Sequence, residues 1–151
     1  MNTTINYLQI AEVQLSYSID QTKERAKINM SYDAVEMFRG VFENFMQHHE
    51  EFWIMLLSGS SRVLGLQKIS QGCLSETLVD LRFVMQGAIL ANASSIIACH
   101  NHPSGLLYPS SQDDKLTERI KEACKIFSIR FLDHVILSEE SHYSYADEGR
   151  L

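Results

Sequence analysis

The chain has 151 residues, of which 45% are hydrophobic and 21% are charged. This composition is typical of one globular domain and excludes a chain dominated by disorder. The 13 basic and 19 acidic residues give a net charge of −6. That balance argues against duplex DNA as a partner, because DNA-binding surfaces neutralise phosphates with an excess of Lys and Arg.

The sequence carries no pattern for export or membrane insertion. Residues 1–9 contain no basic stretch followed by an apolar one, so we expect no signal peptide. The longest strictly apolar run, 52–57, is too short to span a bilayer. The cysteine count is odd and no CxxC pair occurs, so Cys73, Cys99 and Cys124 are expected to be reduced, buried thiols. We therefore expect a cytoplasmic protein without a membrane partner.

Hydrophobic periodicity predicts the elements of the first half of the chain. Alternating apolar and polar residues predict a half-buried strand over 13–19. Ser31 is expected to cap a helix whose apolar positions extend to Phe45. Residues 51–70 predict a β-hairpin, because an apolar run and a return strand flank the turn residues 58–61.

The second half alternates between helices and strands. A helix is expected from Leu78 to about Asn92, and a short buried strand over 95–99. An irregular loop containing both prolines follows, then a helix to Phe127. Further strands are expected at 129–137 and, less regularly, at 142–146. Helices separated by strands, with one hairpin and no internal repeat, predict a single three-layer α/β domain with a mixed central β-sheet flanked by helices.

One segment carries groups that could bind a metal. His100 and His102 directly follow the buried strand and project to the same side if the extended backbone continues. Asp113 would lie in the first turn of a helix that begins near Ser110, within reach if the loop folds back. Two imidazoles and one carboxylate leave a fourth position for water, which is typical of a catalytic rather than a structural zinc site.

Simpler interpretations exist for the same residues. His-x-His pairs are common on surfaces without a metal. Ser110 also has the character of a helix N-cap, and Asp113 that of the acidic residue in a capping box. Capping and metal binding are compatible, because a capped helix start holds an aspartate rigidly.

A hydrolytic metal site also needs a general base. Glu50 and Glu51 precede the apolar strand, and one of these carboxylates could reach the site from a neighbouring strand. The alternative is that both are solvated residues between a helix and a strand.

The motif HNHPSG followed by PSSQD resembles the RadC-like members of the JAMM (MPN⁺) metalloprotease superfamily. That pattern combines an upstream glutamate, His-x-His, seven residues, Ser, two residues and Asp. Glu51 with the apolar residues after it resembles the strand of the family that opens with the glutamate, and Leu132-Asp133-His134 resembles a later strand. The resemblance covers residues 31–151, leaving 1–30 as an N-terminal extension that includes the predicted strand.

The resemblance implies an MPN domain with a cytidine-deaminase-like arrangement and Zn²⁺ as cofactor. It implies His100, His102 and Asp113 as zinc ligands, Glu51 as the base that deprotonates water, and Ser110 as a donor to the developing oxyanion. The substrate implied is a peptide or protein cleaved at a peptide or isopeptide bond.

The alternative function is a non-enzymatic RadC-like module associated with DNA repair or recombination. RadC-like proteins usually carry an N-terminal helix-hairpin-helix domain, and the residues before 31 show no such pair of helices. A predicted helix combines the basic residues Lys115, Arg119, Lys121 and Lys125 with the acidic Glu118 and Glu122, so we interpret these residues as a solvated face. His134 is interpreted as a hydrogen-bonded histidine beside the core, with the orientation of a metal ligand as its alternative role.

Overall fold

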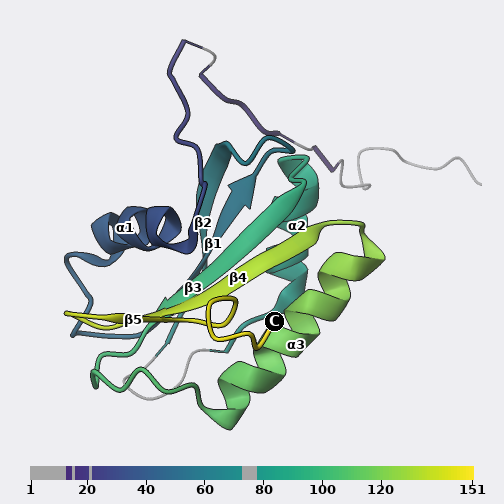
Figure 1. The fold of residues 1–151 in the computed structure, drawn as a ribbon. Helices are drawn as coiled ribbons and strands as arrows, with labels where there is room; N and C mark the ends of the chain where they lie inside the picture. Colours follow the sequence, from purple (N-terminus) through teal and green to yellow (C-terminus); the bar gives the residue numbers. More distant parts are fainter. Residues whose placement is uncertain (1–12, 15, 21, 73–77) are drawn as a thin grey trace, which may run out of the picture.

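The computed structural model describes residues 13–14, 16–20, 22–72 and 78–151. Three helices and five strands alternate along this part of the chain (Figure 1). In chain order they are α1 (Ser31–Phe42), β1 (Glu51–Leu57), β2 (Val63–Gln71), α2 (Leu81–Leu90), β3 (Ser95–Asn101), α3 (Ser111–Ile126), β4 (Arg130–Leu137) and β5 (His142–Ser144).

The strands form one mixed sheet in the order β2-β1-β3-β4-β5. β1 is antiparallel to both β2 and β3, whereas β3 is parallel to β4. Every residue of β3 is buried, because β3 is central in the sheet and both of its faces are covered. In the antiparallel register Phe52 pairs with His100, so the start of β1 lies beside the end of β3.

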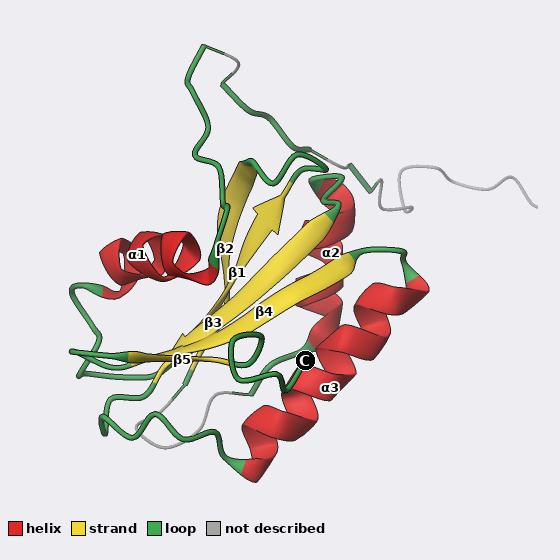
Figure 2. Cartoon of the chain, viewed as in Figure 1, coloured by secondary structure: helices red, strands yellow, loops and turns green. Residues whose placement is uncertain are grey.

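Helices cover both faces of the sheet, as Figure 2 shows. On one face α1 packs Val35, Phe38 and Phe42 against the odd-numbered residues of β1 and β3, such as Met55 and Ile97. On the other face α2 and α3 pack against even-numbered residues of the same strands; these are Phe52, Ile54, Leu56, Ile96 and Ala98. The predicted three-layer α/β domain with a mixed sheet is therefore confirmed.

The strand predicted over 13–19 is wrong for the residues that are described there. None of them pairs with a strand, and Val13 is 84% exposed. The Tyr17 hydroxyl donates to the Leu64 carbonyl, but regular contact with the sheet begins only where Lys27 pairs with Arg62. Alternating residues form a half-buried strand only where a sheet edge receives them, and the segment runs outside the sheet (Figure 1).

The first helix differs from its prediction at both ends. Ser31 is the first helical residue rather than the cap, and the Asp33 carboxylate accepts the backbone amides that precede it. Helix α1 ends at Phe42, and successive turns follow. The Phe45 ring still packs on Phe42, with ring centroids 5.2 Å apart. Its apolar spacing therefore reflects packing against the core and not a continued helix.

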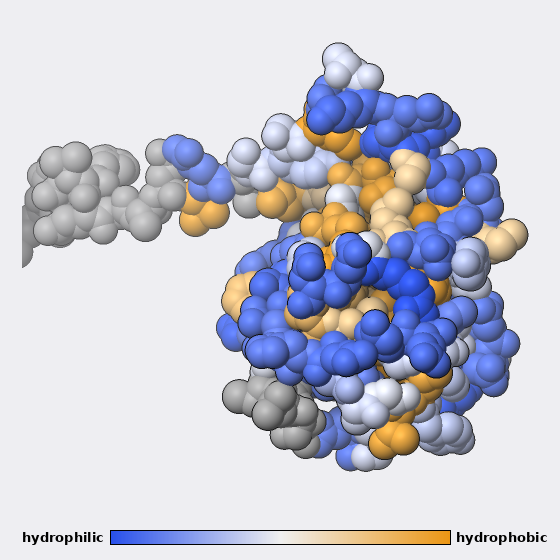
Figure 3. Space-filling view, turned by 90° about the vertical axis from the view of Figure 1, so that its left-hand side faces the viewer, coloured by the Kyte–Doolittle hydropathy of each residue, from blue (hydrophilic) through white to orange (hydrophobic). Residues whose placement is uncertain are grey.

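The remaining predicted elements are confirmed with shifts of a few residues, including the hairpin at 51–70. Cys99 and Cys124 are buried free thiols, and Cys73 lies outside the described residues. Within the described ranges, the helices are all too short or too polar to cross a membrane. Seen from the side that carries α1, the surface is mostly hydrophilic with smaller apolar patches (Figure 3).

Truncation of Phe38 tests the core beneath α1. The side chain is completely buried, so Phe38→Ala should lower the free energy of unfolding by about 3–5 kcal/mol. Tyr32→Ala, at an exposed position of the same helix, should change it by less than about 0.5 kcal/mol. Urea unfolding of both variants measures the difference, and equal effects would contradict the packing described.

Candidate metal centre

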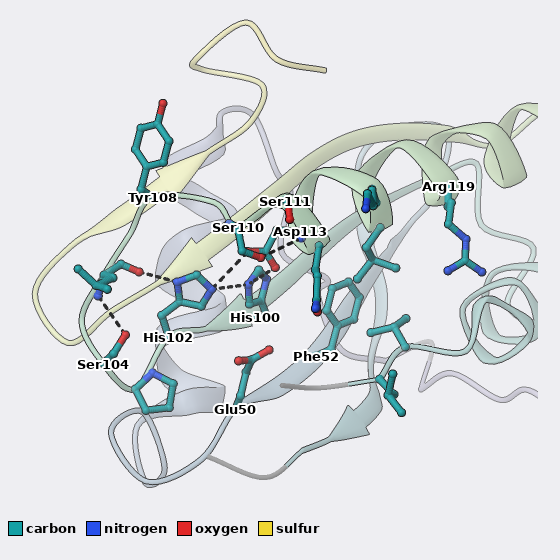
Figure 4. A pocket seen from close by; sticks show the side chains of 17 residues that line it. Glu50, Phe52, His100, His102, Ser104, Tyr108, Ser110, Ser111, Asp113 and Arg119 are labelled. Atoms are coloured by element: carbon teal, nitrogen blue, oxygen red, sulfur yellow. Dashed lines mark hydrogen bonds and ion pairs between the residues drawn. The ribbon is translucent and has the colours of Figure 1, made fainter. Parts of the chain in front are cut away.

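The predicted His-x-His pair lies at the carboxyl end of β3. His100 is buried in the last part of the strand, and the His102 amide continues the pairing by donating to the Leu137 carbonyl of β4. Because the backbone stays extended, the two imidazoles project from the same face of the sheet, toward α3. Figure 4 shows the two rings side by side, and their Nε2 atoms are 2.9 Å apart.

Asp113 approaches the two histidines from the first turn of α3. Ser110 is the N-cap of this helix, and its hydroxyl accepts the Asp113 amide while the Asp113 carboxylate accepts the Ser110 amide. This capping box fixes the carboxylate, whose oxygens lie 3.1 Å from His100 Nε2 and 3.7 Å from His102 Nε2. The possible ligand atoms of His100, His102 and Asp113 lie within 4.8 Å of one another. The structure thus brings these three predicted residues together.

Hydrogen bonds on the far side of each ring fix which nitrogen faces the cluster. His102 Nδ1 contacts the Leu106 carbonyl, which can only accept, so Nδ1 carries the proton. His100 Nδ1 contacts His134 Nε2 at 2.9 Å, and His134 Nδ1 contacts the Thr117 hydroxyl at 2.6 Å. That hydroxyl donates to the Asp113 carbonyl and must accept from His134. His134 Nε2 is therefore an acceptor, and both cluster histidines present Nε2 lone pairs.

His134 combines the two roles that the sequence interpretation gave as alternatives. It is a completely buried, hydrogen-bonded histidine, as expected, and its contact with His100 Nδ1 also orients that ring. Burial first, and then the charge of His100, lowers the pKa of His134 well below its usual value. A neutral His134 is the form that the hydrogen-bond chain requires. The position of His134 in an apolar strand indicated that it is buried. Its contact with His100 could not be predicted, because that contact depends on the β3–β4 register.

The electrostatics of the cluster suit a cation. Burial opposes ionisation of Asp113, but the imidazole of His100 and the bonds from Ser110 hold the pKa of its carboxyl well below the usual range. Burial, followed by the neighbouring His100, lowers the pKa of His102. An ionised Asp113 carboxylate beside a His102 imidazole that resists protonation is therefore favoured, and these are the forms in which the two groups bind metals.

Glu50, and not Glu51, faces the cluster. Glu50 lines the same cavity as His100 and His102, and Figure 4 shows its carboxylate pointing toward the two imidazoles. The pleat explains the choice, because Glu50 shares the face of Phe52, whose ring stacks on His100 with centroids 6.0 Å apart. The prediction that placed Glu51 at the site is wrong by one residue of strand register.

Glu51 points to the opposite face, where it is 3% exposed. Its carboxylate accepts from the Trp53 indole at 2.7 Å and from Lys68 at 3.3 Å, and it contacts His49 Nε2 at 2.9 Å. Burial raises its pKa, but these three partners outweigh burial, so the pKa of Glu51 is lowered. The local environment makes Glu51 a buried, ionised anchor for the start of β1.

Asn101 joins this anchor to the histidines. It lies between them in sequence but points to the opposite face, where its side-chain oxygen accepts the Glu51 amide. Its amide group donates to the backbone carbonyls of Met46 and His49. The strand that carries the histidines is thereby tied to the turn that carries Glu50.

A cavity of about 730 Å³ opens over the cluster. His100, His102, Asp113, Glu50 and Ser110 all line it. Its outer walls come from α3 and from the loop after β3. Leu106 and Tyr108 are exposed side chains of that loop. A substrate could therefore reach the cluster from solvent.

The chain is thus an α/β domain with a candidate metal site. Two histidines at the end of the central strand and an aspartate from α3 lie beneath an open cavity. Comparison with known families makes the class specific. A profile of the RadC-like JAB domain matches residues 28–150. The chain belongs to the RadC-like JAB domain family.

Curated relatives agree with this assignment. A UPF0758 protein of Flavobacterium johnsoniae is 39% identical over 123 residues, which cover 82% of this chain and 53% of the relative. A UPF0758 protein of Porphyromonas gingivalis is 42% identical over 68% of this chain and 45% of its own length. One from Pseudomonas fluorescens is 34% identical over 91% and 64%. The chain thus spans about half the length of the first two relatives.

The anchor role of Glu51 predicts a pH-dependent effect on stability. A lowered folded-state pKa stabilises the fold above the usual Glu value, near 4.5, and this contribution is lost as the pH falls through the lowered value. Glu51→Gln should therefore lower the free energy of unfolding by roughly 1–3 kcal/mol at pH 7. Urea unfolding should give a smaller difference from wild type at pH 3.

The exposed Glu43 provides the matched control. Glu43→Gln should leave stability within about 0.5 kcal/mol of wild type at both pH values. An effect of Glu51→Gln that is equal at pH 7 and pH 3 would contradict the ionised anchor.

Proposed function

We propose that this domain is a zinc-dependent metallopeptidase or isopeptidase that hydrolyses amide bonds with an activated water. The observation that carries the proposal is the His100–His102–Asp113 cluster under an open cavity. An adjacent carboxylate and a hydroxyl complete the groups that such a reaction needs. This complete set favours an enzyme over a non-enzymatic module of the same fold.

The three residues fit zinc. Two Nε2 lone pairs only 2.9 Å apart repel each other unless a proton or a cation lies between them, and both Nδ1 atoms already hold the ring protons. A tetrahedral zinc with ligand bonds of about 2.0–2.1 Å would hold its ligand atoms about 3.3 Å apart, close to the separations in the cluster. When bound, Zn²⁺ would supply a Lewis acid that lowers the pKa of water to about 7.

Glu50 is the base in this proposal. Its carboxylate points toward the cluster from the start of β1, where it can take a proton from the attacking water and return it to the leaving amine. Glu50 takes over the role that the sequence interpretation gave to Glu51.

Ser110 keeps its proposed role as a donor to the developing oxyanion. Its hydroxyl donates to the Asp113 carboxylate at 2.6 Å and also lines the cavity. Rotation about one side-chain bond would turn this donor toward a bound carbonyl. A hydroxyl that donates there would stabilise the negative charge that develops on the carbonyl oxygen. The helix cap and the oxyanion donor are then two uses of one side chain.

Zinc content tests the ligand set. Purified wild-type protein dialysed against Zn²⁺ should retain one zinc per chain by elemental analysis, and His100→Ala and His102→Ala should each lose most of it. Both variants should stay folded, because two apolar cores surround the sheet independently of the site. His48→Ala removes an exposed histidine and should keep its zinc. Full zinc occupancy in the double variant His100→Ala/His102→Ala would refute the proposal.

Glu50→Gln tests the base. Zinc should remain bound, while chelator-sensitive hydrolysis of peptides should fall by roughly 10²–10⁴, the usual contribution of a general base. Glu51→Gln is the register control: turnover per folded, zinc-loaded molecule should stay within a fewfold of wild type. The reverse pattern, with Glu51→Gln inactive and Glu50→Gln active, would show that the strand register assigned here is wrong.

A further inference from the structure

Helix α3 divides its charged residues between two faces. Lys115 and Arg119 lie one turn apart and both line the cavity, with Leu116 between them. The acidic Glu118 instead pairs with Lys121, outside the cavity lining. Lys115 and Arg119 are exposed, as expected for a solvated face, and they also line the cavity, whereas Glu118 does not.

Among the described residues, neither Lys115 nor Arg119 has a side-chain hydrogen bond or an ion pair. Arg82 binds the Asp80 carboxylate directly at 2.5 Å, and Arg119 adds only a weaker charge interaction with the same carboxylate. Within the described ranges, two exposed cations therefore line the cavity without a hydrogen-bond or ion-pair partner, and Figure 4 shows Arg119 at the end away from the histidines.

The cavity wall around the cations is apolar. Leu116 and Val79 are partly buried against the core, and Leu78 is 90% exposed at the rim. On the other side of the cluster, Leu106 and Tyr108 form a second exposed apolar wall. Apolar walls with a few charged groups at one end are typical of sites that fix the orientation of a ligand.

We propose that Lys115 and Arg119 form a carboxylate-binding subsite, so that the preferred substrate is an acidic peptide. Its carboxylate, from a free C-terminus or an Asp or Glu side chain, would bind a few residues from the scissile bond. The inference rests on the proposed function, because it assumes that the reacting bond lies at the metal cluster.

The geometry sets the spacing between the bond and the carboxylate. Arg119 follows Asp113 along the same helix by about 9 Å, given a rise of 1.5 Å per residue. An extended peptide advances about 3.3 Å per residue. The carboxylate is therefore expected about two to four residues from the cut, and Lys115 would contact the chain between them.

A peptide suits this subsite better than a nucleic acid. Duplex DNA binding relies on roughly 6–10 phosphate contacts, whereas the cavity offers two cations in a chain with a net charge of −6. Two cations match a single carboxylate, and the apolar walls match aliphatic side chains on either side of it.

Cleavage of a randomised nonapeptide pool tests the subsite. The zinc-loaded protein is incubated with the pool in free-acid and amidated forms, and mass spectrometry maps the cut sites. Wild type should favour Asp, Glu or a free C-terminus two to four residues from the cut, on one side only. In Lys115→Glu/Arg119→Glu the rate on preferred acidic peptides should fall by roughly fivefold or more, and Lys or Arg should become favoured at that position.

Reversing two cations elsewhere on α3 is the matched control. Lys121→Glu/Lys125→Glu changes the net charge by the same amount outside the cavity lining, so the acidic preference should persist. Cleavage without acidic preference, or the same loss of preference in the control, would overturn the subsite.

A binding experiment separates the subsite from the proposed reaction. The peptides acetyl-Leu-Ala-Ala-Glu and acetyl-Leu-Ala-Ala-Gln-amide are titrated into zinc-loaded protein while the backbone amide shifts of α3 are followed by NMR. Only the acidic peptide should shift residues 115–119, in wild type and in the control but not in Lys115→Glu/Arg119→Glu. This result without any cleavage would refute the peptidase and leave the subsite standing. No binding by either peptide would overturn the subsite.

A duplex oligonucleotide is titrated in the same way. It should leave these amides unchanged at physiological salt. Stronger perturbation by the duplex than by the acidic peptide, abolished in Lys115→Glu/Arg119→Glu, would show that the cations serve a nucleic acid and would overturn the peptide proposal.

Discussion

The antiparallel pairing of β1 with β3 is the constraint on which the site depends. It brings the start of one strand beside the end of the other, so that a carboxylate and two imidazoles distant in sequence become neighbours. The pleat then distributes the side chains between the faces of the sheet. Glu50, His100 and His102 share the face toward α3, while Glu51 and Asn101 share the face toward α1. A slip of one residue would exchange these two sets completely.

Helix α3 adds the third possible metal ligand through interactions that also start the helix. The Ser110–Asp113 capping box stabilises the first turn and holds the carboxylate toward the histidines. One turn further along α3 lies Thr117, whose hydroxyl determines the proton positions of His134 and, through it, of His100. The capping interpretation and the metal interpretation of this segment are therefore two consequences of one local structure.

The sequence predicted what local patterns determine and missed what depends on register. The hairpin at 51–70 and the strand after it could be predicted because apolar runs and turn residues bound them. The choice between Glu50 and Glu51 could not, because the run 52–57 is apolar at every position and is buried on both faces, so no alternation marks the direction of a side chain. The strand predicted at 13–19 failed for the converse reason: its alternation is clear, but no sheet edge receives it.

The two neighbouring glutamates differ in role because they lie on opposite faces of the sheet. Glu51 is held by Trp53, His49 and Lys68, and these bonds lower its pKa by stabilising the charged form. A carboxylate stabilised in this way is a weaker base, whereas general-base catalysis favours a pKa near the working pH. The same bonds make Glu51 a firm anchor, and Asn101 links that anchor to the strand that carries the histidines. The face toward α1 therefore gives rigidity to the strands whose opposite face carries the candidate metal cluster.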